Sequence, residues 1–130
     1  MILVDTHIVV WLTMDQERLS KRAGAAIAAA RLEEGGVAIA DVTLWELGML
    51  ITRGRIKPPH SLATFLRRVE ETFLVFPITS ATAEVSMQFS NHYPNDPMDR
   101  IIGATAVVEG ISLVTADEKI RASGEVTTVW

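Results

Sequence analysis

The stretch GGVAIADVTLWELGMLITRG, residues 35–54, holds a strand pattern followed at once by a helix pattern. The run VAIA is short and apolar and follows two glycines, as expected for a buried strand. Gly54 stands where the helix pattern stops, which is typical of a helix end. We therefore predict a strand within 37–41 and a helix over 43–54. That helix is indicated by apolar side chains at helical spacing, at Leu44, Leu47, Leu50 and Ile51.

The same alternation covers the rest of the chain in both directions. Helical patterns occupy 18–36, 61–73, 80–92 and 96–110, and the glycines at 35 and 36 suit the left-handed cap of a helix end. Alternating strands and helices indicate an α/β fold: one domain over 1–130, with a central parallel sheet flanked by α-helices on both faces. The other strand-like runs are ILVD at 2–5, FLVFPIT at 73–79, SLVTAD at 112–117 and EVTTVW at 125–130.

Composition narrows the class of protein. The chain of 130 residues is 48% apolar and 22% charged, which is typical of one globular domain. The absence of cysteine excludes disulfides, thiolate metal sites and a cysteine nucleophile. The net charge of −4 argues against bulk attraction to nucleic acid. Neither a signal peptide nor a membrane-spanning run is recognisable, so we expect a cytoplasmic protein without membrane contact.

Acidic residues follow several of the predicted strands. Asp5 ends the first run, Asp41 follows VAIA, and Asp117 follows SLVTA. Glu46 and Asp99 lie in the first turns of two predicted helices. Because ligands of open α/β sheets bind at the carboxyl ends of the strands, several of these carboxylates could meet at one edge.

Each acid also has a purely structural interpretation, and Asp5, which directly ends a strand, fits it least. Asp96 precedes Pro97, which makes Asp96 a natural N-cap. Asp99 would then occupy the third helical position, where an acid complements the helix dipole. The spacing of a capping box occurs twice, at Thr43 with Glu46 and at Thr115 with Glu118.

Carboxylates that gather at one edge of the sheet would repel one another. Two carboxylates about 4 Å apart repel by roughly 4 kcal/mol at an effective dielectric constant of about 20. Such a group shifts its pKa values upward or recruits a cation. With no cysteine and three histidines, the expected cation is hard and oxygen-seeking, Mg²⁺ or Mn²⁺. The chemistry of such a site is metal-assisted phosphodiester hydrolysis.

Four segments resemble, in order and spacing, the motifs of PIN-domain ribonucleases: ILVDTHIVVW, TLWELGMLITRGRI, NDPMDRIIGATA and LVTAD. The resemblance covers essentially the whole chain and is to the VapC-type toxins of bacterial toxin–antitoxin pairs. It implies a Mg²⁺- or Mn²⁺-dependent endoribonuclease with an RNA substrate. It also implies a homodimer and a cognate antitoxin protein as partner.

The resemblance assigns roles to individual residues. It aligns Asp99, and not Asp96, with a metal-site acid. Leu50 departs from the family pattern, which often has a lysine there, and Asp41 stands where a small residue is common. We expect Asp41 to cap a helix and not to join the site. The residues that match the catalytic and metal-binding acids are Asp5, Glu46, Asp99 and Asp117, and those that match supporting hydroxyl residues are Thr6 and Thr115.

Some basic and aromatic residues are candidates for contact with RNA. His7 could contact the substrate, but a hydrogen-bonded residue at the start of the first helix is favoured. Arg100 is a candidate phosphate ligand, and a solvated salt bridge is its alternative. Trp45 could stack on a base, but a core or interface position is preferred. Arg53 and Arg55, in the densest basic stretch, either complement a helix end or hold RNA phosphates.

Other functions compete with a nuclease. A haloacid-dehalogenase-type phosphatase needs a second aspartate two residues after the first, where this chain has His7. A receiver-like regulatory domain needs an acid pair at the end of the first strand, where ILVD offers one acid. A PIN-like binding module without catalysis is the third alternative, and the complete set of four acids argues against it.

Overall fold

The computed structural model describes all residues from 1 to 130, and its strands form one parallel sheet. The strand order is β3-β2-β1-β4-β5, so β1 is central. The parallel α/β prediction is confirmed, and each of the five strand-like runs contains a strand. The strands are β1 (Ile2–Val4), β2 (Val37–Ala40), β3 (Leu74–Phe76), β4 (Leu113–Val114) and β5 (Thr128–Val129).

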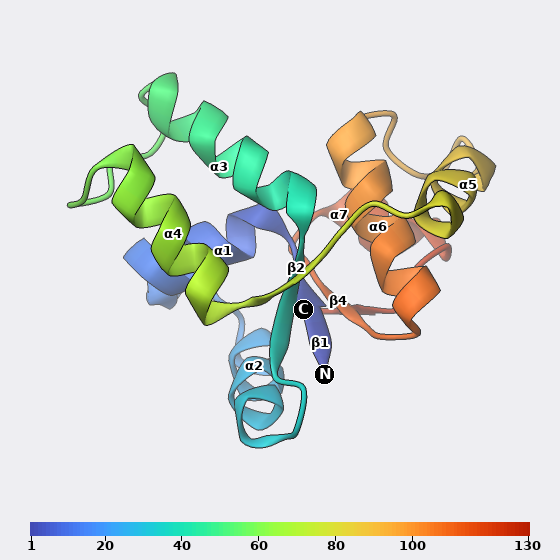
Figure 1. Ribbon diagram of the computed structural model, residues 1–130. Helices are drawn as coiled ribbons and strands as arrows, with labels where there is room; N and C mark the ends of the chain where they lie inside the picture. Colours follow the sequence, from blue (N-terminus) through green and yellow to red (C-terminus); the bar gives the residue numbers. More distant parts are fainter.

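Seven α-helices and one 3₁₀ helix connect and cover the strands. Figure 1 shows α3 and α4 on one side of the strands and α5 and α6 on the other. None of the helices combines the length and the apolar character that crossing a membrane requires. The elements are α1 (Thr6–Met14), η1 (Gln16–Arg18), α2 (Lys21–Leu32), α3 (Asp41–Thr52), α4 (Leu62–Thr72), α5 (Ser80–Gln88), α6 (Pro97–Glu109) and α7 (Glu118–Ser123).

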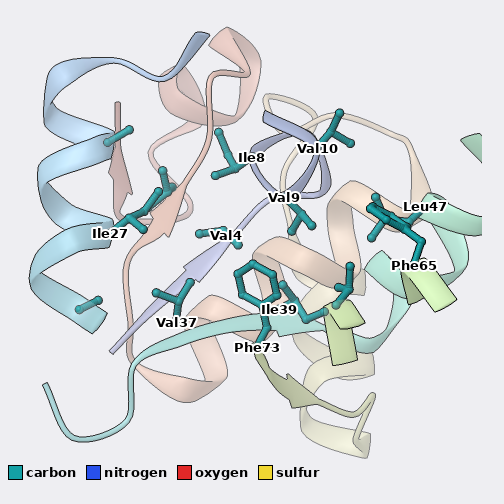
Figure 2. Packing of buried hydrophobic residues seen from close by; sticks show 14 residues of the cluster. Val4, Ile8, Val9, Val10, Ile27, Val37, Ile39, Leu47, Phe65 and Phe73 are labelled. Carbon is teal, nitrogen blue, oxygen red and sulfur yellow. The ribbon is translucent and has the colours of Figure 1, made fainter. Parts of the chain in front are cut away.

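The pleat of the strands divides the core into two parts, because successive side chains point to opposite faces. Val4 and Ile39 point to one face and pack with α1, α2 and α4 in a cluster of 14 buried residues (Figure 2). Leu3 and Ala38, their immediate neighbours, point to the other face and pack with α6 in a cluster of 12. A one-residue slip of either strand would expose both sets to the wrong face, so the register is firmly set.

Glycines are predicted to end two helices, α2 and α3, and the structure confirms this only for α3. Gly54 follows α3 with a φ of 69°, and its N–H donates to the carbonyl of Ile51 at 3.0 Å. At α2 the prediction is wrong in detail, because the helix already ends at Leu32. Gly35 and Gly36, at φ 111° and 63°, instead shape the turn that leads into β2.

The start of α3 also differs from the prediction. The helix begins at Asp41, and Ala40 stands at the N-cap position without a side-chain hydrogen bond. The predicted cap at Asp41 is therefore wrong. Its Oδ2 accepts a 3.0 Å hydrogen bond from the N–H of Ile78, in the connection between β3 and α5. Its Oδ1 is buried without a partner.

Candidate active site

The four predicted site acids lie around the carboxyl end of the central strand. Asp5 directly follows β1, and Glu46 lies in α3. Asp99 lies in the first turn of α6, and Asp117 is the N-cap of α7. In Figure 1, α3 and α6 stand on opposite sides of the strands. Chain order reverses next to β1, which is where open α/β sheets bind ligands.

Asp5 is buried and held by a residue that directly follows the neighbouring strand, β4. Its side chain is 7% exposed, and its Oδ2 accepts a 2.7 Å hydrogen bond from the hydroxyl of Thr115, just after β4. Burial raises the pKa of Asp5, while the Thr115 hydrogen bond and the charge of His7 oppose the rise. The negative charge of Asp117 raises this pKa further, which places Asp117 within electrostatic reach of Asp5.

Glu46 is held by a hydroxyl from α1. Thr6 donates a 2.7 Å hydrogen bond to Oε1 of Glu46, and the hydroxyls of Thr6 and Thr43 are 3.1 Å apart. Thr43 lies inside α3 and not at its cap, so the capping-box alternative for Thr43 and Glu46 is wrong. Burial raises the pKa of Glu46, and the charges of Asp5 and Asp96 raise it further. The hydrogen bond from Thr6 lowers it.

The first turn of α6 separates Asp96 from Asp99. Oδ1 of Asp96 accepts hydrogen bonds from the N–H of Met98 at 2.8 Å and of Asp99 at 3.2 Å, so the predicted N-cap is confirmed. The carboxylate of Asp99 accepts no hydrogen bond from the protein. Burial raises the pKa of Asp99 to about 7, together with the charges of Asp5, Asp96 and Glu46. Asp99 is thus the acid whose charge the fold compensates least.

Asp117 combines a structural role with its place beside Asp5. Its Oδ1 accepts a 3.0 Å hydrogen bond from the N–H of Ile120 and so caps α7. Its own N–H donates to the hydroxyl of Thr115 at 3.1 Å. The capping-box alternative for Thr115 and Glu118 is therefore wrong, because the cap residue is Asp117. Thr115 instead joins Asp117 to Asp5.

The candidate substrate-binding residues are exposed, with one exception. His7 lies at the start of α1, as favoured, but its side chain is exposed and makes no hydrogen bond; its ring lies 6.3 Å from that of Trp11. Arg53 and Arg55 are exposed beyond the end of α3 and form no ion pair. Trp45 is 62% exposed, so it is not a core residue.

Arg100 is the exception among these residues. Its guanidinium donates to the carbonyls of Ser86 and Phe89, each at 3.3 Å, and of Ser90 at 3.5 Å. A fourth contact reaches Oδ1 of Asn95 at 3.4 Å. The solvated salt bridge considered from sequence is therefore wrong. The guanidinium is already engaged within the fold.

Two residues near the acids were missed from the sequence. Thr43 contributes the hydroxyl beside Thr6, and its only signal was the spacing that resembled a capping box. Tyr93 is 1% exposed, and its hydroxyl donates a 2.6 Å hydrogen bond to the backbone carbonyl of Asp99. Nothing in the sequence around Tyr93 indicates this contact, because it depends on how the 89–96 segment folds back onto α6.

The donor set suits a hard divalent cation. Carboxylate oxygens are the preferred ligands of Mg²⁺ and Mn²⁺, and no lysine or arginine forms an ion pair with any of the four acids. No three of these side chains close around a single point, however. A cation held here would therefore keep water molecules or substrate oxygens among its ligands, as Mg²⁺ commonly does in proteins.

The chain is similar to known proteins along its whole length. A family model described as PIN domain matches residues 2–125. Ribonuclease VapC22 of Mycobacterium tuberculosis is 31% identical over 131 residues, which cover 99% of this chain and 98% of that relative.

Solved structures share the fold. A chain of a toxin–antitoxin complex from Klebsiella pneumoniae has a TM-score of 0.66 and 24% identity, with 94% of this chain and 91% of that chain covered. A chain of VapBC2 from Rickettsia felis, bound to a DNA fragment from its promoter, has a TM-score of 0.74 and 15% identity, with 98% and 97% covered.

Proposed function

Because this chain belongs to the PIN-domain family, we propose that it is a metal-dependent endoribonuclease and the toxin of a toxin–antitoxin pair. The observation that carries the proposal is the set of four carboxylates at the carboxyl end of β1, which lie without a compensating cation. Burial and the charges of neighbouring acids raise the pKa values of Asp5, Glu46 and Asp99. The full-length relative named as a VapC ribonuclease supports the same activity. The nuclease domain is proposed to span 1–130.

In this proposal the acids hold Mg²⁺ or Mn²⁺, which when bound supplies an activated water and a Lewis acid for the scissile phosphate. Asp5 and Glu46 are oriented for this by Thr115 and Thr6. Asp99, without a hydrogen bond to its carboxylate, offers both oxygens. The products are an RNA fragment with a 5′-phosphate and one with a 3′-hydroxyl.

The exposed basic residues supply the sequence-independent part of RNA binding. Arg53, which directly follows α3, comes seven residues after Glu46, about two helical turns further along the chain. Arg55 and Lys57 extend this basic stretch, and His7 stands exposed next to the acids. We propose that these side chains contact RNA phosphates or bases beside the site.

The partner is proposed to be an antitoxin that covers the acids. Uncompensated carboxylates attract a basic side chain of such a partner, which would block the site. Similar solved structures are named as toxin–antitoxin complexes. The proposal includes a homodimer and action in the cytoplasm, where the RNA substrate and the antitoxin would both be available.

Cleavage assays test the activity. RNA incubated with the protein and Mg²⁺ or Mn²⁺ should be cut, and excess EDTA should stop the cleavage. Asp99→Asn should reduce the rate by orders of magnitude, because it removes a charge and an oxygen donor while keeping the shape. Glu109→Gln is the matched control, since Glu109 is exposed at the far end of the same helix. Cleavage that persists undiminished in EDTA would refute the metal-dependent mechanism.

Expression tests the toxin role separately. The wild-type protein should arrest growth when produced alone, and the Asp99→Asn variant should not. Co-expression of the cognate antitoxin should restore growth. A non-catalytic PIN-like or receiver-like binding module, the alternative function, predicts no RNA cleavage and no difference between the two proteins. Harmless expression of a protein that cuts RNA in vitro would contradict the toxin role alone.

A further inference from the structure

We propose that Arg100 is a positioning residue for Asp99 and not a ligand of RNA phosphate. The inference rests on the proposed function, because it assumes that Asp99 holds a divalent cation. Arg100 is the residue that follows Asp99 in the first two turns of α6. Its side chain connects that part of α6 to the end of α5.

The guanidinium of Arg100 donates hydrogen bonds to backbone carbonyls at the C-terminal end of α5. The carbonyls of Ser86, Phe89 and Ser90 belong to the last turn of α5 and to the two residues after it. Helix carbonyls at this end lack partners within the helix and carry the negative end of its dipole. A planar, permanently charged guanidinium can reach the carbonyl of Ser86 and the two carbonyls that follow α5 at once, whereas a lysine ammonium cannot do so with the same geometry.

The contacts fix the direction in which Asp99 points. Consecutive residues of an α-helix lie about 100° apart around its axis. Holding Arg100 toward α5 therefore sets the rotation of the turn that carries Asp99. The charges of Asp5 and Glu46 are among the causes of the raised pKa of Asp99, so its carboxyl lies within electrostatic reach of these acids.

The other side-chain hydrogen bonds of this turn do not reach α5. The first N–H groups of a helix have no partners within the helix, and here Asp96 binds two of them. Tyr93 binds the carbonyl of Asp99 itself. Both contacts act within the segment 93–99, whereas the side chain of Arg100 adds hydrogen bonds from α6 to the end of α5 to the packing of these two helices. Arg100 also forms no ion pair with Asp99, so its influence is geometric.

Three roles for Arg100 make different predictions. A positioning residue controls cation affinity, so its loss weakens Mn²⁺ binding even without RNA. A phosphate ligand controls RNA affinity, so its loss raises KM and weakens the salt dependence of binding. A purely structural residue lowers thermal stability and leaves the Mn²⁺ affinity of the folded protein unchanged.

The test compares Arg100→Lys and Arg100→Gln with the wild type, Arg53→Gln and Asp99→Asn. The affinity for Mn²⁺ is measured by calorimetry without RNA. The kcat and KM of RNA cleavage are measured at saturating Mn²⁺. We expect Arg100→Gln to weaken Mn²⁺ binding by about 10- to 100-fold, as the loss of a residue behind a metal ligand typically does. Arg100→Lys should weaken Mn²⁺ binding less than Arg100→Gln does. The kcat and KM of both variants should approach wild-type values at saturating Mn²⁺. Arg53→Gln should raise KM without changing the affinity for Mn²⁺.

Other results would overturn the inference. Unchanged Mn²⁺ affinity in the Arg100 variants, with a raised KM as in Arg53→Gln, would make Arg100 an RNA ligand. Unchanged affinity with only a lower Tm would make it structural. If Arg100→Gln does not fold, Arg100→Lys decides, together with Asn95→Ala, which removes one acceptor of the guanidinium. Wild-type Mn²⁺ affinity in Asp99→Asn would instead show that the proposed metal site is wrong, and the inference would fall with it.

Discussion

Thr115 donates a 2.7 Å hydrogen bond to Asp5 across the two central strands, although the two residues are 110 positions apart in the chain. The acceptor is an almost fully buried carboxylate, and hydrogen bonds to ionised groups are stronger than those between neutral groups. Thr115 therefore fixes one oxygen of Asp5 and leaves the other available. The same hydroxyl accepts a hydrogen bond from the N–H of Asp117, which ties a second acid to this pair.

Thr115→Val should weaken both the fold and the site. It keeps the shape but removes the donor, which leaves a buried carboxylate unsatisfied at a cost of about 1–3 kcal/mol. The pKa of Asp5 should rise further, because the hydrogen bond now lowers it. Thr115→Ser keeps the hydroxyl and serves as the control. Urea unfolding and Mn²⁺ titration of the three proteins check this, and equal Mn²⁺ affinities for the valine and serine variants would contradict it.

The metal-free protein should lose stability as the pH rises from about 4 to about 7. The pKa of Asp99 is raised from 3.8 to about 7 in the folded protein. The folded state therefore binds a proton that the unfolded state releases, and the free energy of unfolding falls with pH across this window. Above about pH 7 this contribution is constant. Asp99→Asn should flatten the slope, which unfolding experiments between pH 4 and 8 would measure.

Mn²⁺ binding should strengthen over the same pH range. A cation needs ionised carboxylates, so it competes with the proton on Asp99. Below about pH 7 the affinity should increase by roughly tenfold per pH unit if one proton is displaced. Calorimetry at several pH values provides the measurement. A Mn²⁺ affinity independent of pH between 5.5 and 7 would show that Asp99 is already ionised without metal.

Gly103→Ala should destabilise the protein, whereas Gly48→Ala should not. An added Cβ at Gly103 would overlap the hydroxyl of Tyr93 and approach its ring carbon to 2.7 Å. The overlap forces buried atoms apart at a cost of about 1–3 kcal/mol. At Gly48, inside α3, the nearest side-chain atom is 3.7 Å away, so alanine should add about 0.5–1 kcal/mol. Thermal unfolding of both variants tests the pair, and equal effects would contradict the packing seen at Gly103.

Two substitutions separate the two contributions of Asp96, its N-cap hydrogen bonds and its charge. Asp96→Ala removes the N-cap hydrogen bonds and should cost roughly 1 kcal/mol of stability. Asp96→Asn keeps a good cap residue but removes a charge that raises the pKa of Asp99. The asparagine variant should therefore keep its stability and show a lower pKa at Asp99. Cleavage should survive both changes; loss of cleavage in a well-folded Asp96→Ala protein would mean that Asp96 belongs to the site.

The sequence by itself determined the elements that carry the acids. The strands could be predicted because short runs rich in β-branched residues favour the extended conformation. Asp96 could be predicted as a helix N-cap because Pro97 follows it. The positions of Asp5, Asp99 and Asp117 at element ends follow from the same local rules. Parallel order then places the carboxyl ends of all five strands at one edge.

Only the tertiary structure decided what each side chain contacts at that edge. Thr43 with Glu46 and Thr115 with Glu118 both matched a capping box, yet Glu46 binds Thr6 and Thr115 binds Asp5. The sequence made Arg100 a candidate phosphate ligand, but in the structure its guanidinium donates to carbonyls at the end of α5. Local spacing states which contacts are possible within a segment. A hydroxyl or guanidinium takes the partner that leaves the fewest buried polar groups unsatisfied, and that partner often comes from a distant part of the chain.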